Sequence, residues 1–265
     1  MEPPQSKRPL TPEQELTVDE LLEFYNISDP VYQGLIRWRV AILQEWRTQW
    51  LGNIVNVLEI GTGHYPFTLS FGTSCRDMDF TGIETDANMS ARARQHLAHK
   101  FRSATVLSSR WDSNLTQAQG WQNKFDLVTT FEVFEHVPAE EEFLINVRRV
   151  LRPGGYLILE TPNANVTPLF VRVFGHPPDG GGEYMDKDHV NELGFRTLFR
   201  ELRASGFDVI DFDCYYLPFS LWDDRSLEPY RAERLYELIH RAAGHFPFYS
   251  YVQAFIARKH QSRQL

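Results

Sequence analysis

The sequence predicts an α/β domain of the doubly wound class, in which helices cover both faces of a mostly parallel, seven-stranded sheet. Two observations carry this prediction. Five short apolar segments alternate with segments of helical periodicity, which is typical of βαβ units. Further along the chain, one more helical segment is flanked by two more strand candidates, and these bring the expected number of strands to seven.

The N-terminal part of the chain reads as a tail followed by two helices. Residues 1–11 are polar and rich in proline, and we expect them to be disordered. Thr11 and then Asp29 each precede a proline, which is the signal of an N-cap followed by the first helical position. We therefore expect residues 12–52 to form a helical cover over the functional site of a domain that spans residues 53–265.

The strands of the sheet are expected where short runs of β-branched and aromatic residues occur. Helices at 87–101 and 138–151 separate some of these runs, and the second is the clearer one. It begins with a proline and three glutamates and ends with arginines, which complements the helix dipole. The first five strand candidates are residues 53–60, 78–85, 103–110, 124–131 and 155–162.

A helix and two strands are expected to complete the domain, at residues 195–207, 207–216 and 249–259. Two further segments, at about 164–190 and 215–248, are interpreted as insertions. The first is rich in glycine and can move as a lid, whereas the second contributes aromatic side chains that can wall an apolar pocket.

Composition excludes several classes of protein. The formal net charge is -8, which disfavours a nucleic acid partner. Cys75 and Cys214 are the only cysteines, too few for a disulfide framework or a thiolate metal site, which suits a reducing cytoplasm. The first residues lack the apolar core of a signal peptide, and no stretch is long enough to span a bilayer. We predict a cytoplasmic protein with no integral membrane segment, while its oligomeric state stays open.

A glycine turn follows the first strand candidate, at the edge of the sheet where doubly wound proteins bind ligands. Gly61 and Gly63 let the backbone approach a ligand closely, and Glu84 ends the second strand candidate. An acid about 20 residues after such a turn reaches the hydroxyls of a ribose. Positions 64–66 hold histidine, tyrosine and proline in place of the glycine that a pyrophosphate needs. The pattern favours a nucleoside without phosphates.

Four segments resemble the successive motifs of class I S-adenosylmethionine-dependent methyltransferases: "VLEIGTG", "FTGIETD", "FDLVTTFEVFEHV" and "LRPGGYLILETPN". They cover roughly residues 54–163, and the last two are most similar to the branch of ubiquinone-biosynthesis O-methyltransferases and many small-molecule methyltransferases. The resemblance implies a Rossmann-like methyltransferase fold with one antiparallel terminal strand. It also implies S-adenosylmethionine as the cofactor.

The resemblance further implies which residues bind the cofactor. The glycine turn and the acid before it would border the methionine part, and the acid that ends the second strand would bind the ribose. A tryptophan and an aspartate lie near the place where the family often contacts adenine. The family usually has a third glycine where this chain has Tyr65, whose ring would crowd the cofactor or lie over it. The predicted cofactor-binding residues are Glu59, Gly61, Gly63, Glu84, Trp111, Asp112 and Phe131.

A polar set follows the fourth strand candidate, and its spacing would place Glu132, Glu135 and His136 on one face of a helical turn. In one interpretation His136 is a general base and Glu135 orients it, and we predict these two as the catalytic residues. In the less favoured one, the three bind a divalent metal ion with Asp188 or His189. In a third, they are structural, and methyl transfer needs alignment alone.

The predicted function is methyl transfer from S-adenosylmethionine to a small molecule, with oxygen preferred as the methylated atom. A metal-dependent methyltransferase of RNA termini is an alternative, but the acidic net charge counts against it. A regulatory protein that binds the cofactor without turnover is another alternative, because a fold does not fix a function.

Overall fold

The computed structural model describes residues 18–23, 30–63, 65–97, 99–138, 140–166, 189–215 and 250–261. The predicted tail and most of both predicted insertions lie outside the described residues, as do His64 and Asp188. Within the described ranges, none of the helices combines the length and the apolar character needed to cross a membrane.

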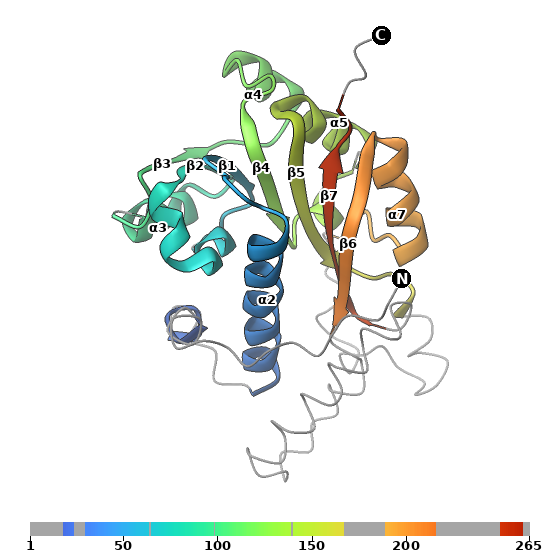
Figure 1. Cartoon of the computed structure of the whole chain (residues 1–265), viewed down its shortest axis with the longest axis horizontal. Helices are drawn as coiled ribbons and strands as arrows, with labels where there is room; N and C mark the ends of the chain where they lie inside the picture. The colour runs from blue at the N-terminus through green and yellow to red at the C-terminus, as the bar shows by residue number, and fades with distance from the viewer. Residues whose placement is uncertain are drawn as a thin grey trace.

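Seven strands form one sheet in the order β3-β2-β1-β4-β5-β7-β6 (Figure 1). Strands β1 to β5 pair in parallel, whereas β7 lies antiparallel between β5 and β6. This topology confirms the predicted doubly wound, mostly parallel sheet with one antiparallel strand. The strands are β1 (Asn56–Ile60), β2 (Asp79–Glu84), β3 (Ser103–Ser108), β4 (Phe125–Phe131), β5 (Leu151–Pro162), β6 (Phe207–Tyr215) and β7 (Val252–Lys259).

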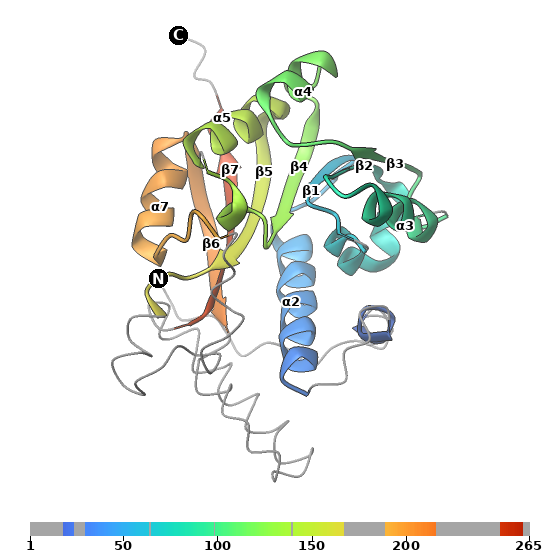
Figure 2. The same cartoon turned by 180° about the vertical axis from the view of Figure 1, so that it is seen from behind.

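Helices cover both faces of the sheet, and each face has its own hydrophobic core (Figures 1 and 2). Helices α2, η1 and α3 contribute to the core of one face, and α4, η2, α5 and α7 contribute to the core of the other. Their bounds are α2 (Pro30–Gln49), η1 (Phe67–Asp77), α3 (Ala87–Leu97), α4 (Ser113–Ala118), η2 (Phe134–His136), α5 (Glu140–Val150) and α7 (Phe195–Ala204).

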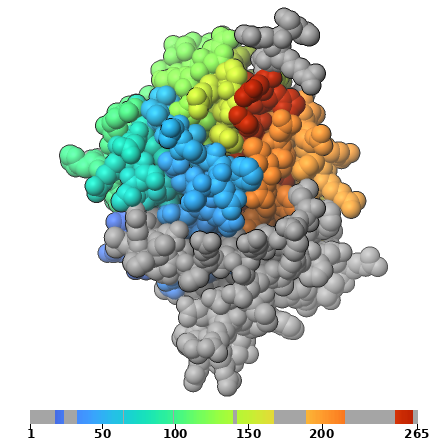
Figure 3. Space-filling model, viewed as in Figure 1, coloured from blue at the N-terminus to red at the C-terminus, as the bar shows by residue number. Residues whose placement is uncertain are grey.

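Helix α2 is the part of the predicted N-terminal cover that the structure describes best. Its buried side includes Ile36, Val40 and Leu43, which join the core of the first face. The Nε1 of Trp46 donates a hydrogen bond to Asp211 of β6 over 3.1 Å. Figure 3 shows the surface of α2 beside that of β6. Helix α2 therefore packs against one face of the sheet and is hydrogen-bonded to β6.

Some elements differ from the sequence prediction. The chain between β1 and β2 forms the 3-10 helix η1, interrupted at Gly72, where φ is 61°. Strand β5 begins at Leu151 rather than at residue 155, and the Leu151 carbonyl accepts a hydrogen bond from Lys259 over 2.6 Å. The short helix α4 was not predicted, because its six residues carry little periodic pattern.

Candidate functional site

A cavity of about 660 Å³ opens at the carboxyl ends of the parallel strands. Its wall consists mainly of residues 60–63 after β1, 83–85 after β2, 109–111 after β3, and 131–133 with 136–138 after β4. In a doubly wound sheet this edge is the place where ligands bind. The cavity is within the range of about 300–1,000 Å³ that is usual for small-molecule sites.

The glycine turn has two glycines with different reasons to lack a side chain. Gly61 has a φ of 77°, and a Cβ atom there would lie 2.2 Å from Cγ2 of Val133. Glycine at this position lets the segment after β4 pack against the turn. Gly63 has a φ of 54°, but a Cβ atom there would meet nothing within 4 Å. Open space therefore lies beside Gly63, on the wall of the cavity.

Glu84 joins the end of β2 to the glycine turn. Its Oε2 accepts a hydrogen bond from the Gly63 amide over 2.8 Å, and its Oε1 accepts one from the Asp86 amide over 3.0 Å. The side chain lines the cavity although the residue is only 8% exposed. The structure thus brings together the turn and the acid that the sequence singled out.

Replacing Glu84 with alanine is expected to weaken cofactor binding by about 1.5–3 kcal/mol, because the ribose hydroxyls lose a charged hydrogen-bond acceptor. Titration calorimetry with S-adenosylhomocysteine measures the change. Asp86→Ala is a matched control, since this neighbouring acid caps α3 and does not line the cavity. Equal affinities in wild type and Glu84→Ala would assign the ribose to another residue.

Trp111 and Phe131 also line the cavity, as the sequence interpretation requires of cofactor-binding residues. The Nε1 of Trp111 is buried and has no hydrogen-bond partner among the described residues. A buried donor without a partner is unfavourable, so a ligand that supplies an acceptor would relieve this cost.

Glu59 and Asp112 lie behind the cavity wall rather than on it. Glu59 is fully buried, and its oxygens accept hydrogen bonds from the amides of Phe67 (2.8 Å) and Thr68 (2.9 Å). Asp112 caps α4 by accepting a hydrogen bond from the Leu115 amide over 2.8 Å. Neither side chain lines the cavity. In this arrangement they fix the loops beside the site, and direct contact with the cofactor stays a prediction.

The stability of the protein is expected to depend on the protonation of Glu59. Burial raises the pKa of Glu59 to about 7, although hydrogen bonds from Thr68 and Phe67 oppose the rise. A carboxyl whose pKa is raised on folding stabilises the folded state below its ordinary pKa, and this contribution is lost as the pH rises towards 7. The free energy of unfolding should therefore fall between about pH 5 and about pH 8, by roughly 1.4 kcal/mol per unit of pKa shift.

Urea unfolding of wild type and Glu59→Gln at both pH values measures this contribution. Only the difference between the two pH dependences matters, because the substitution also changes hydrogen bonds that do not titrate. Parallel pH dependences in the two proteins would contradict the assignment to Glu59.

Tyr65, which replaces the third glycine of the family, does not line the cavity. Its hydroxyl donates a hydrogen bond to Oε2 of Glu20 over 3.1 Å, and its ring is 3% exposed. Lys100 also contacts Glu20, over 2.5 Å. Tyr65 therefore neither crowds the cavity nor lies over it, and instead links the glycine turn to the helical residues 18–23.

The polar set after β4 is not arranged on one helical turn, so that prediction is wrong. Helix η2 contains only Phe134–His136, and Glu132 precedes it with a φ of 53°. Glu132 and His136 line the cavity, whereas Glu135 is fully buried. The positive φ of Glu132 turns the chain between β4 and η2, so Glu132 lies outside the helical turn, although its carboxyl group still interacts with that of Glu135.

Glu135 holds two segments of the chain together. Its Oε2 accepts a hydrogen bond from Thr161 over 2.8 Å, and its backbone carbonyl accepts from the amides of Val190 and Asn191. Its Oε1 is buried without a hydrogen-bond partner among the described residues. Burial raises the pKa of Glu135 to about 7, and the bond from Thr161 opposes the rise.

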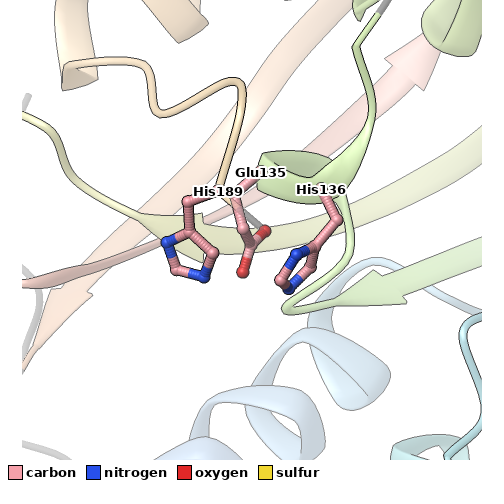
Figure 4. A group of neighbouring side chains, drawn as sticks. All are labelled: Glu135, His136 and His189. Carbon is pink, nitrogen blue, oxygen red and sulfur yellow. The ribbon is translucent and has the colours of Figure 1, made fainter. Parts of the chain in front are cut away.

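His189 lies beside this pair. The ring centroids of His136 and His189 are 4.7 Å apart, and the side chain of Glu135 points toward the same place as the two rings (Figure 4). One potential ligand atom from each residue lies within 4.8 Å of the others, which is compatible with a metal ion. Nδ1 of His189 also contacts Glu192 over 2.6 Å. Glu132, which the metal interpretation included, is not part of this group.

Sequence reasoning missed a buried arginine next to the site. Arg39 of α2 contacts both carboxylate oxygens of Glu160 and is 5% exposed. A signal was present, because position 39 falls on the same helical face as the apolar Ile36 and Leu43. A charge in an apolar stripe indicates a buried partner, although the sequence does not reveal which one.

The fold and the site together define a Rossmann-like, class I methyltransferase domain. The model of a family described as "Methyltransferase domain" matches residues 21–212, and the chain belongs to this family. S-adenosylmethionine is the cofactor of such domains, so the predicted family and cofactor are confirmed.

Curated relatives and solved structures agree with this assignment. The chain is 31% identical over 161 residues to the ubiquinone biosynthesis O-methyltransferase of Pseudomonas aeruginosa. The aligned region covers 58% of this chain and 65% of the relative. The chain thus spans less than two thirds of that relative. A SAM-dependent methyltransferase from Archaeoglobus fulgidus has a TM-score of 0.52 at 18% identity, over 83% of this chain and 92% of that one.

A phosphoethanolamine N-methyltransferase 2 of Haemonchus contortus, solved with S-adenosyl-L-methionine, has a TM-score of 0.54 at 16% identity. The likeness covers 84% of this chain and 52% of that chain. At these identities, the two solved structures support the fold alone.

Proposed function

We propose that the protein transfers the methyl group of S-adenosylmethionine to a small molecule, with an oxygen atom as the acceptor. The observation that carries this proposal is the cavity at the carboxyl ends of β1 to β4. There the Gly63 amide donates a hydrogen bond to Glu84, and open space lies beside Gly63. The name of the Pseudomonas aeruginosa relative supports oxygen over nitrogen or carbon.

The residues around the cavity fit the cofactor. Gly63 leaves room for it, Glu84 offers a carboxylate for its ribose, and Trp111 offers a buried N–H without a partner among the described residues. S-adenosylmethionine supplies a methyl group bound to a positively charged sulfur. A bound ligand would displace water from the aromatic and aliphatic residues of the wall, which would strengthen the electrostatic interactions inside the site.

We assign to His136 the role of the general base that removes the proton from the acceptor's hydroxyl group. His136 lines the cavity after β4, and a neutral imidazole can accept a proton from a hydroxyl near neutral pH. Glu135 lies beside it in η2 (Figure 4), and Thr161 donates a hydrogen bond to its carboxylate. One carboxylate oxygen of Glu135 lies within 4.8 Å of a ring nitrogen of His136, so a negative charge there would stabilise the protonated imidazole.

Calorimetry and a transfer assay test the proposal. The purified protein should bind S-adenosylmethionine and S-adenosylhomocysteine, and it should transfer a labelled methyl group to at least one member of a panel of small phenols and alcohols. Binding without transfer to any compound would favour a regulatory protein that only binds the cofactor. Absence of binding, together with binding of a nicotinamide dinucleotide, would overturn the assignment.

A second candidate is a metal-assisted methyltransferase, and the grouping of Glu135, His136 and His189 favours it (Figure 4). A divalent cation there would polarise an acceptor oxygen. The net charge of -8 disfavours an RNA terminus as that acceptor. Loss of activity in a chelator, with recovery on addition of magnesium, manganese or zinc, would support this candidate. Activity that is indifferent to the chelator would exclude it.

A further inference from the structure

Arg39 is the centre of a buried polar network that connects α2 with the ends of three strands. We call Arg39, Glu132, Glu160 and Tyr215 the Arg39 network. Nε of Arg39 donates to Oε2 of Glu160 over 3.0 Å, and a second guanidinium nitrogen contacts Oε1 of Glu160 and, over 3.3 Å, Oε1 of Glu132. The Tyr215 hydroxyl donates to Glu160 as well. Arg39 thus makes a bidentate ion pair with Glu160, which fixes the orientation of the guanidinium group.

The same arginine supports two aromatic rings of the cavity wall. The guanidinium carbon of Arg39 lies 4.3 Å from the ring centroid of Phe67 and 5.9 Å from that of Phe131. The two rings are 5.2 Å apart, and both line the cavity, whereas Arg39 itself lies behind them. A guanidinium so close to a ring face is attracted to it, so Arg39 restrains both rings.

Glu132 is the polar group that this arrangement presents to the cavity. Its backbone amide donates to the Glu160 carbonyl over 3.1 Å, and its φ of 53° is unusual for a residue other than glycine. Its side chain is 41% exposed, and the residue lines the cavity, whereas the side chain of Glu160 is 2% exposed. Glu132 is therefore a carboxyl group that contacts Arg39 on one side and is open to a ligand on the other. Burial and the neighbouring Glu135 raise the pKa of Glu132 to about 7, and Arg39 opposes the rise.

The position of Glu132 separates it from the groups assigned to the cofactor. Gly63 lies after β1 and Glu84 ends β2, whereas Glu132 follows β4, next to Phe131, which is the one predicted cofactor-binding residue on that strand. Under the proposed function, on which this inference rests, the acceptor binds at the β4 side. A carboxylate beside two phenyl rings fits a ligand with an O–H group on an aromatic or apolar body.

We propose that Glu132 accepts a hydrogen bond from the acceptor's hydroxyl group, and that Arg39 is a positioning residue that holds Glu132, Phe67 and Phe131 in place for it. The N-terminal helix α2 is thereby part of the acceptor site. The expected class of acceptor is a hydroxylated aromatic or apolar compound.

The test uses p-cresol and p-xylene, two rings of nearly equal shape that differ by a hydroxyl in place of a methyl group. Their binding to the complex of the full-length protein with S-adenosylhomocysteine is measured by ligand-detected NMR titration at about pH 8, above the pKa of Glu132. The wild type should bind p-cresol about tenfold or more tightly than p-xylene, because a hydrogen bond to a charged group is worth about this factor or more. Glu132→Met should remove the preference, and Arg39→Lys should reduce it severalfold.

Controls separate positioning from folding. Glu132→Met should keep the wild-type affinity for S-adenosylhomocysteine, because Glu132 does not belong to the groups assigned to the cofactor. Arg39→Lys should change that affinity less than it changes the preference for p-cresol, because Arg39 reaches a predicted cofactor-binding residue only through the ring of Phe131. Arg37→Lys is the matched control on the same helix, where Arg37 is 34% exposed and faces Asp19 at 4.0 Å. If Arg39→Lys does not fold, the pair Arg39→Met with Glu160→Gln replaces it, because it leaves no single buried charge.

Each outcome decides a different point. Failure of the wild type to bind S-adenosylhomocysteine would overturn the proposed function itself. If the cofactor product binds but the wild type does not prefer p-cresol, or Glu132→Met keeps the preference, the role of Glu132 is overturned. A preference that disappears in Glu132→Met yet is unchanged in Arg39→Lys would overturn the positioning role of Arg39.

Discussion

Arg39→Met is expected to lower the free energy of unfolding by about 3–5 kcal/mol, because removing one partner of a buried ion pair leaves the other charge without compensation. Glu160 has a side chain that is 2% exposed, and both of its oxygens contact Arg39. Burial raises the pKa of Glu160 to about 7, and Arg39 opposes that rise. Without the arginine, Glu160 must take up a proton or remain charged in an apolar setting. Urea unfolding near neutral pH measures the loss.

Two comparisons make this stability prediction specific. Arg37→Met should cost less than about 1 kcal/mol, because its ion pair with Asp19 is 4.0 Å long and joins side chains that are 34% and 66% exposed. Adding Glu160→Gln to Arg39→Met should recover part of the loss, since no unpaired charge then remains buried. A loss below about 1 kcal/mol for Arg39→Met would mean that the Arg39 network contributes little to stability.

His136→Ala is expected to lower turnover about a hundredfold or more while the affinity for S-adenosylmethionine stays close to that of wild type. The imidazole lines the cavity after β4, whereas the groups assigned to the ribose and adenine lie at the end of β2 and after β3. Loss of a general base removes a proton acceptor in the transition state but leaves cofactor binding intact. Single-turnover rates with labelled cofactor, together with calorimetry, measure the two quantities separately.

His260→Ala is the control for this variant, because His260 is exposed and contacts Asp208 at 3.0 Å, outside the cavity wall. His189→Ala separates the two catalytic interpretations. If the three residues bind a metal ion, His189→Ala should lower turnover as much as His136→Ala does. If His136 is a general base, His189→Ala should have the smaller effect, because His189 is then only a neighbour. Near-wild-type turnover in His136→Ala, with no effect of chelation, would leave alignment of the substrates as the source of catalysis.

The fold could be predicted from the sequence because strand and helix periods are local. The alternation of apolar runs with helical segments was enough to predict the sheet. The spacing from Gly63 to Glu84 was enough to predict that these two residues lie close together, and they are joined by a hydrogen bond. Short elements escaped prediction, since η2 has three residues and its neighbour Glu132 takes a positive φ. Spacing alone therefore assigned the wrong shared face to Glu132, Glu135 and His136.

Roles that depend on distant partners could not be predicted in the same way. Glu59 belongs to the glycine-turn motif, yet its carboxylate oxygens accept hydrogen bonds from the first two backbone amides of η1. Arg39 and Glu160 are 121 positions apart in the chain, and only the folded sheet brings them together. A local pattern can show that a charged residue lies on a buried face, but it does not identify the residue that compensates it.

The position of β7 between β5 and β6 has a consequence for the order of events during synthesis. Strands β1 to β5 can pair as they appear, whereas β5 and β6 have no contact in the sheet until β7 arrives between them. Through that interval one edge of β5 offers unpaired backbone groups, the kind of edge at which other chains pair and aggregate. Tyr215 of β6 likewise cannot take its place beside Glu160 until then. Nascent chains that stop before residue 252 should accordingly depend on chaperones far more than those that include β7.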